Sequence, residues 1–197
     1  MHMPAPSRRA LILAVALGLA ACSSPPPRPT YPDIRFTDEP PLRLAIASVE
    51  VHEDYQMPFK EPNVEHLFPV PPSRALENWA HDRLRATGNN GTAIFSIRVA
   101  SVVETELPVN QGVTGVFTTQ ASERYDLTIT AALTIMENGL AVHTANVTTT
   151  RSQSLLQGIT PNDRDKAWYE MTKTAMADFD KQMESEMRNT FGDYLER

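Results

Sequence analysis

The chain has 197 residues, of which 41% are hydrophobic, and its 24 acidic residues outnumber 18 Lys and Arg for a formal net charge of −6 at pH 7. This acidic balance argues against nucleic acid as a partner, because phosphate backbones are bound through clusters of Lys and Arg. Cys22 is the single cysteine, so no disulfide can form within the chain. The length is enough for one ordinary domain with a hydrophobic core.

The N-terminus has the three parts of a secretory signal. Two arginines precede an uncharged apolar run over residues 10–21, which is too short to cross a bilayer because about 20 apolar residues are needed. The run ends in small residues before a cysteine. These last four residues resemble the bacterial lipobox: Leu19, Ala20, Ala21 and Cys22.

The lipobox resemblance implies that residues 1–21 are a signal peptide and that Cys22 becomes the mature N-terminus, carrying a covalent diacylglyceryl group and an N-acyl lipid. Several acyl chains on one residue anchor a protein stably to a membrane. The alternatives are an ordinary signal peptide with a stray cysteine, or a buried apolar helix. Serine, not aspartate, follows Cys22, which in Gram-negative lipoproteins favours the outer membrane over the inner membrane. The mature chain would have 176 residues, a net charge of about −8 and a periplasmic location.

Residues 22–41 are expected to be the lipidated cysteine and a spacer, because seven prolines lie between positions 23 and 41. Proline-rich segments favour extended conformations of about 3.1 Å per residue, which would hold the domain up to roughly 60 Å from the bilayer. The single periplasmic domain is then expected over residues 42–197.

The first half of this domain predicts a strand, an irregular segment and a helix. Alternating apolar residues over 42–51 predict a strand with a bulge near Ala47, and five prolines disfavour regular structure over 52–72. Apolar residues at helical spacing predict a helix over 73–87, with Ser73 as its N-cap and Gly88 in a left-handed C-terminal cap.

Three further strands are predicted. The first, over 93–106, is expected to place Val99 and Val103 on the same face as Phe95 and Ile97. The second, over 124–136, has the clearest alternation in the chain, and Asn138-Gly139 predicts a tight hairpin turn into the third, over about 140–154. One face of this hairpin is rich in threonine, as expected for a sheet with one covered and one wet face.

A helix is predicted over about 161–190, since Thr160 can cap it and a proline occupies its first position. Its apolar stripe consists of Trp168, Met171, Ala175, Phe179, Met183 and Met187. The order strand, helix, three strands, helix predicts an α+β two-layer sandwich. In this fold a four-stranded, mainly antiparallel sheet carries two helices on one face.

This layout, together with Cys22, resembles the LPS-assembly lipoprotein family and is similar to the auxiliary lipoproteins of some ABC transporters. The resemblance implies a non-enzymatic accessory in envelope assembly or transport, whose partners are the membrane, through its lipid, and an envelope protein complex. The alternative is a periplasmic lipoprotein that binds a lipid or another small ligand.

No catalytic motif or resident metal is expected. His52 and His66, with neighbouring acids, could converge on a metal only if the proline-rich segment folded back, and a solvated loop is the competing interpretation.

Two features are candidate partner contacts. One is the long connection over 107–122, through Val113, Val116 and Phe117, although these residues could equally pack over the sheet edge. The other is the methionine face of the last helix, including Met183 and Met187, for which a core role is the stronger alternative.

Overall fold

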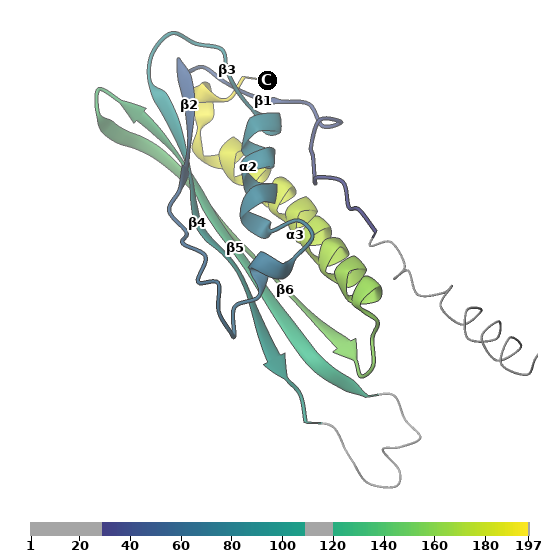
Figure 1. Cartoon of the computed structure of the whole chain (residues 1–197). Coiled ribbons are helices and arrows are strands. Elements are labelled where there is room, and N and C mark those ends of the chain that lie inside the picture. Colours follow the sequence, from purple (N-terminus) through teal and green to yellow (C-terminus); the bar gives the residue numbers. More distant parts are fainter. Residues whose placement is uncertain (1–28, 109–119, 197) are drawn as a thin grey trace, which may run out of the picture.

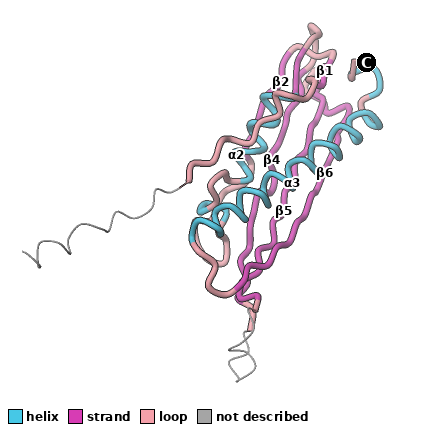
Figure 2. Tube along the Cα trace, turned by 90° about the vertical axis from the view of Figure 1, so that its right-hand side faces the viewer, coloured by secondary structure: helices cyan, strands magenta, loops and turns pink. Residues whose placement is uncertain are grey.

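The computed structural model describes residues 29–108 and 120–196, and it confirms the α+β two-layer sandwich (Figure 1). A four-stranded sheet carries two helices on one of its faces, and both views show the helices side by side (Figure 2). The elements are β1 (Leu42–Leu44), β2 (Ser48–Glu53), η1 (Glu65–Leu67), α2 (Pro72–Arg83), β3 (Leu84–Ala86), β4 (Thr92–Glu106), β5 (Ala121–Glu137), β6 (Leu140–Leu156), α3 (Pro161–Thr190) and η3 (Gly192–Tyr194).

The main sheet has the order β2-β4-β5-β6. The β2–β4 pair is parallel and the other two pairs are antiparallel, which agrees with the prediction of a mainly antiparallel sheet. A parallel pair needs a crossover connection, and α2 lies within the chain that joins β2 to β4. Outside this sheet, β1 and β3 form a small parallel pair.

The strand predicted over 42–51 is divided between these two sheets. Leu42–Leu44 pairs with Leu84–Ala86, whereas Ser48–Glu53 pairs with β4. Between them, the Ile46 N–H donates to the Leu44 carbonyl at 2.8 Å and the Ala47 N–H turns to the Asn90 carbonyl at 3.1 Å. The predicted irregularity near Ala47 is therefore a change of sheet and not a bulge.

The first predicted helix is shorter than expected. It spans Pro72–Arg83, has no side-chain cap, and passes directly into an extended backbone at Leu84. Residues 84–86 pair with β1 because this buries Leu84 against the core. Gly88 consequently caps no helix. A Cβ at Gly88 would lie 2.5 Å from the Ala45 carbonyl carbon, so the residue must be glycine to let two backbone segments approach.

Strands β4, β5 and β6 confirm the three later predictions and extend some of them by a few residues. Asn138 (φ 51°) and Gly139 (φ 79°) form the predicted hairpin turn, since a tight turn between twisted strands needs positive φ at both positions. In β4, an irregularity between Ile97 and Val99 shifts the alternation. Val99 and Val103 are therefore only half-buried, and they do not share the buried face of Phe95 and Ile97 as expected.

Helix α3 matches its prediction at both ends. The Thr160 hydroxyl accepts the Asp163 N–H at 3.2 Å, and Pro161 occupies the first position. All six residues of the predicted stripe are buried. At the centre of the core, the rings of Trp79, Phe95 and Phe179 contact one another with centroids 5.2 to 6.4 Å apart, which joins α2, β4 and α3.

A buried polar network also joins the two helices. Arg83 on α2 is 1% exposed, and it donates to Asp180 (2.8 Å) and Glu184 (2.6 Å) on α3 and to the Pro40 carbonyl. The Trp79 indole N–H donates to the same Asp180 oxygen at 2.7 Å. A charge on the apolar face of a helix is stable only when it is paired, so this network determines how the two helices sit together.

The domain begins earlier in the chain than predicted. Ile34 and Phe36 are buried in the core, and the Arg35 guanidinium donates to Asp82 on α2 at 2.5 and 2.8 Å. The Phe36 N–H donates to the same carboxylate at 2.9 Å. Arg35 holds the pKa of Asp82 below its ordinary value. This part of the expected spacer therefore belongs to the folded domain, because apolar residues between the prolines reach the helix layer.

Candidate functional site

The face of the main sheet that points away from the helices is covered by no helix or strand in the described ranges (Figure 2). The two faces differ sharply in composition along β6. Ala145, Val147 and Thr149 are buried on the helix side, whereas Asn146 and Thr148 are exposed on the other side. The alternation arises because successive side chains of a strand point to opposite faces. We call the uncovered face the open face.

Threonine hydroxyls line the open face in cross-strand rows. Thr130 and Thr148 are 3.0 Å apart through their hydroxyl oxygens, and Thr134 and Thr144 are 3.2 Å apart. Such pairs add modest stability to a sheet. Each hydroxyl can still accept a further hydrogen bond, so this surface suits polar contact with a partner.

Charged groups on the open face are mostly satisfied by their neighbours. Arg124 donates to Asp126 at 2.8 and 3.0 Å, and the Ser152 hydroxyl also donates to Asp126. The Ser152 hydrogen bond and then Arg124 hold the pKa of Asp126 below its ordinary value. Arg98 donates to the Asn146 side chain at 3.2 Å. The face therefore offers hydroxyls and compensated charges, and not a strong field of one sign.

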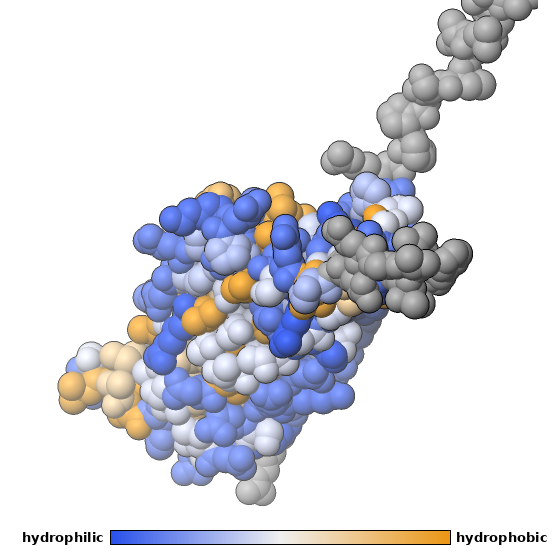
Figure 3. Space-filling view, turned by 90° about the horizontal axis from the view of Figure 1, so that it is seen from below, coloured by the Kyte–Doolittle hydropathy of each residue, from blue (hydrophilic) through white to orange (hydrophobic). Residues whose placement is uncertain are grey.

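The open face ends at a long free strand edge. β6 has 17 residues and is the last strand in the sheet order, so one side of its backbone pairs with no other described strand. Leu140, Val142 and Leu156 on this strand are 70, 42 and 52% exposed. Long edges with exposed apolar residues tend to pair with other chains. On the side of the molecule seen in Figure 3 the surface is mixed, with hydrophobic residues in small groups among hydrophilic ones.

The predicted site residues fall into two groups. Leu19, Ala20, Ala21 and Cys22 of the lipobox, and Val113, Val116 and Phe117 of the long connection, lie outside the described residues. The second group is described, and it excludes the partner-contact prediction in favour of the core role that was the stronger alternative. Met183 and Met187 are fully buried, so they belong to the core and present no surface to a partner. Their helical spacing is the ordinary pattern of a core-facing stripe.

His52 and His66 do not converge. The His52 ring nitrogen Nε2 lies 3.3 Å from Glu50 on the same strand, and the His66 ring contacts the Phe59 ring at 5.6 Å between centroids. Glu65 is fully buried and accepts the Tyr55 hydroxyl at 2.6 Å and the Val102 N–H at 3.1 Å. The Tyr55 pKa is raised, first by burial and then by this hydrogen bond. Within the described ranges, no three His, Cys, Asp or Glu side chains are placed to hold a metal.

Sequence reasoning missed the two buried polar groups that organise the domain, Arg83 and Glu65. A signal existed for Arg83, because it follows Leu76, Trp79 and Ala80 at helical spacing and so lies on the apolar face. Glu65 had no such signal, since it lies in the proline-rich segment before the predicted helix, where the sequence shows no apolar periodicity.

Among the described residues no helix is long and apolar enough to cross a membrane. No family model and no curated protein matches the sequence. Solved structures with a similar arrangement include rare lipoprotein B from Shewanella oneidensis, at 11% identity and a TM-score of 0.39, covering 72% of this chain and 94% of that chain. A minor lipoprotein from Acinetobacter baumannii has 10% identity and a TM-score of 0.37, and the match covers 78% of this chain and 98% of that chain. An uncharacterized lipoprotein B from Nitrosomonas europaea has 16% identity and a TM-score of 0.34, and the match covers 70% of this chain and 82% of that chain. At these scores, activity and partners do not transfer to this chain.

Proposed function

We propose that this chain is a lipid-anchored, non-enzymatic accessory of the bacterial envelope that docks its open face and the free β6 edge on a larger membrane protein complex. The observation that carries the proposal is the asymmetry of the sheet. Two helices pack on one face, whereas the other face carries cross-strand threonine pairs among compensated charges and ends at the free outer edge of β6, a strand of 17 residues. A free edge and a flat polar face together suit a protein partner.

In this proposal, Cys22 carries the lipid and restricts where docking can occur. Tyr31 follows Cys22 by only nine positions, and its ring contacts Tyr169 on α3 at 5.0 Å between centroids. At no more than about 3.6 Å per residue, this length of chain spans at most about 32 Å. The domain would therefore work close to the membrane, nearer than the roughly 60 Å expected for a spacer that continues to residue 41.

Site-specific photo-crosslinking in bacterial membranes tests the proposal. A photoreactive phenylalanine analogue replaces Thr148 on the open face or, as the control, Lys173 on the exposed side of α3. We expect a membrane protein of defined mass to be crosslinked from Thr148 and not from Lys173. Equal crosslinking from both positions would refute the assignment of the open face. Bound lipid in the purified protein, with no protein crosslinked from Thr148, would favour the ligand-binding alternative instead.

The anchor is tested separately with Cys22→Ala in the full-length chain. We expect the variant to move from the membrane fraction to the periplasmic fraction, and mass spectrometry of the wild-type N-terminal peptide to show the acyl groups. An unmodified wild-type Cys22 would contradict the anchor without affecting the docking proposal.

A further inference from the structure

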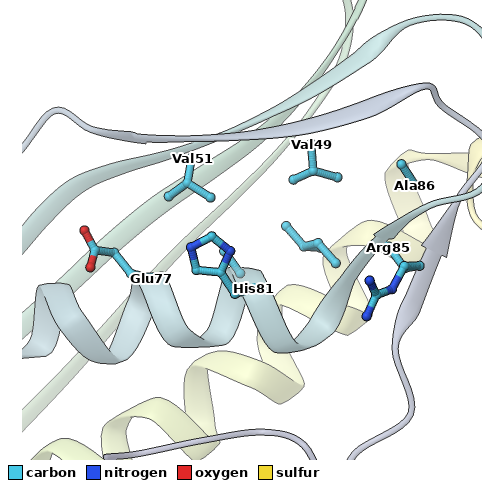
Figure 4. A pocket seen from close by; sticks show the side chains of 8 residues that line it. Val49, Val51, Glu77, His81, Arg85 and Ala86 are labelled. Carbon is cyan, nitrogen blue, oxygen red and sulfur yellow. The ribbon is translucent and has the colours of Figure 1, made fainter.

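A groove of about 640 Å³ lies between β2, α2 and β3, on the helix side of the sheet and away from the open face (Figure 4). Its apolar part is formed by Val49, Val51, Ala80, Leu84 and Ala86, whereas Glu77, His81 and Arg85 line the rest. The two valines are only half-buried, although they point towards the helix layer. The fold therefore leaves part of an apolar surface open at the β2 end of the sheet.

The strand beside this groove has a free edge. β2 is the first strand in the order of the main sheet and pairs only with β4 there. Half of the backbone N–H and C=O groups of an edge strand point outwards and need other partners. Side chains of β2 alternate between the groove (Val49, Val51) and the opposite side (Glu50, His52). A strand added next to β2 would alternate in the same way and direct every second side chain into the groove.

The two ends of the groove carry opposite charge (Figure 4). Glu77 lies at the end near Val51, and Arg85 lies at the end near Val49 and Ala86. Arg43 on β1 is the register partner of Arg85, and both side chains are exposed. Adjacent strands are about 4.8 Å apart, so two like charges are neighbours here.

This pair of arginines differs from most other arginines in the described ranges, although Arg98 too has no acidic partner and donates to Asn146 instead. Seven other arginines form ion pairs with acidic side chains. Neither Arg43 nor Arg85 has an acidic partner within the described part of the chain, in a protein with excess acidic residues. Like charges on directly opposite strand positions are unfavourable, and a carboxylate from another molecule would relieve this repulsion through charge-assisted hydrogen bonds.

We propose that the groove binds an extended peptide segment of a partner protein, which adds as a strand beside β2. Alternate apolar side chains of the peptide lie on the valine floor, a carboxylate meets Arg85 and Arg43, and a basic group lies near Glu77. The six residues of β2 match a peptide of about six residues, since both chains rise by about 3.3 Å per residue. If the carboxylate is the peptide's C-terminus, the peptide runs antiparallel to β2. An acyl chain would leave the strand edge and both charged ends without partners.

The test uses the full-length protein in mild detergent and a fluorescent hexapeptide, Lys-Val-Thr-Val-Thr-Val, with a free C-terminus. Fluorescence anisotropy should show saturable binding below about 1 mM. Arg85→Glu and Val51→Lys should each weaken it by roughly tenfold or more, the scale of losing one charge-assisted contact or the apolar floor. Lys173→Glu on α3 and Leu67→Lys in η1 make comparable changes at exposed positions elsewhere and should leave binding unchanged.

Two further measurements make the outcome decisive. An amidated peptide, and an amidated peptide ending in Glu, separate a C-terminal carboxylate from an acidic side chain as the group that meets Arg85. Hydrogen exchange should show new protection of the β2 amides when the peptide is bound. The proposal is overturned by no binding to the wild-type protein, by equal binding to Arg85→Glu, or by binding without protection of β2. Self-association of the free protein that Val51→Lys abolishes would instead assign the groove to a second copy of this chain. All of these outcomes concern the groove at β2, and none of them bears on docking through the open face.

Discussion

Replacing Arg83 by methionine should be among the most damaging single changes in this domain. The substitution keeps an unbranched side chain but removes the guanidinium that donates to Asp180, Glu184 and the Pro40 carbonyl. The Asp180 carboxylate, 12% exposed in its side chain, would retain the Trp79 N–H as its donor. A buried charge would thus lose its counter-ion and one of the two hydrogen bonds that it accepts.

The expected cost follows from this burial. Breaking a buried ion pair by removing one partner costs about 3–5 kcal/mol, because the remaining charge stays buried without compensation. Asp180 is partly reached by solvent, so we expect a value near the lower end, about 3 kcal/mol. For a domain of this size, each kcal/mol lowers the Tm by about 2–4 °C, which gives a decrease of roughly 6–12 °C.

Urea unfolding at pH 7, followed by circular dichroism, measures this cost. Arg188→Met is the matched control, because Arg188 pairs with the same Glu184 at 2.6 Å but is 54% exposed. An exposed pair of this kind is worth about 0.5 kcal/mol or less. Adding Asp180→Asn to Arg83→Met should recover part of the loss, since the amide oxygen can still accept from Trp79 without a buried charge. Equal losses in Arg83→Met and Arg188→Met would refute the reasoning.

Three further changes test other parts of the fold. Asp82→Asn should release the segment around Arg35 and make trypsin cleavage there roughly tenfold faster, because charge-assisted hydrogen bonds are worth about 1.5–3 kcal/mol. In the folded wild-type protein the pKa of Asp82 is lowered below its ordinary value of 3.8. The stabilisation by Arg35 is therefore fully present above pH 3.8 and is lost as the pH falls through the lowered pKa of the folded protein. Cleavage of the same segment by an acid-active protease should accelerate only in that pH range. Gly88→Ala should cost at least about 2 kcal/mol in urea unfolding, because overpacking against backbone forces the chain to shift. Tyr55→Phe should cost about 1–3 kcal/mol, because it leaves the buried Glu65 carboxyl with one fewer donor.

Each of these changes has a control elsewhere in the chain. Asp33→Asn removes an exposed contact to Arg74 and should leave cleavage nearly unchanged. Gly139→Ala meets no atom within 4 Å, so its cost should be limited to about 1–2 kcal/mol of left-handed backbone strain. Tyr169→Phe, on the half-buried side of α3, should cost less than Tyr55→Phe. A loss at the control position as large as at the test position would contradict the corresponding explanation.

The amino-acid sequence was sufficient for the elements whose determinants are local. The alternation over 124–136 predicted β5, and Asn138-Gly139 predicted the turn because few other residues accept positive φ at both positions. Thr160, Pro161 and the apolar stripe predicted both ends and the buried face of α3. The lipobox at Cys22 is equally local, and the lipid anchor stays a prediction from the sequence.

Long-range packing decided the remaining features. Residues 42–51 have the pattern of one strand, but their first half pairs with β3 and their second half with β4. Helix α2 ends at Arg83, and Leu84 is buried where it pairs with β1. Ile34 and Phe36 were hidden among prolines, and only the helix layer shows what they pack against. The open face and the groove at β2 likewise depend on which surfaces the helices leave uncovered, and no local pattern in the sequence contains that information.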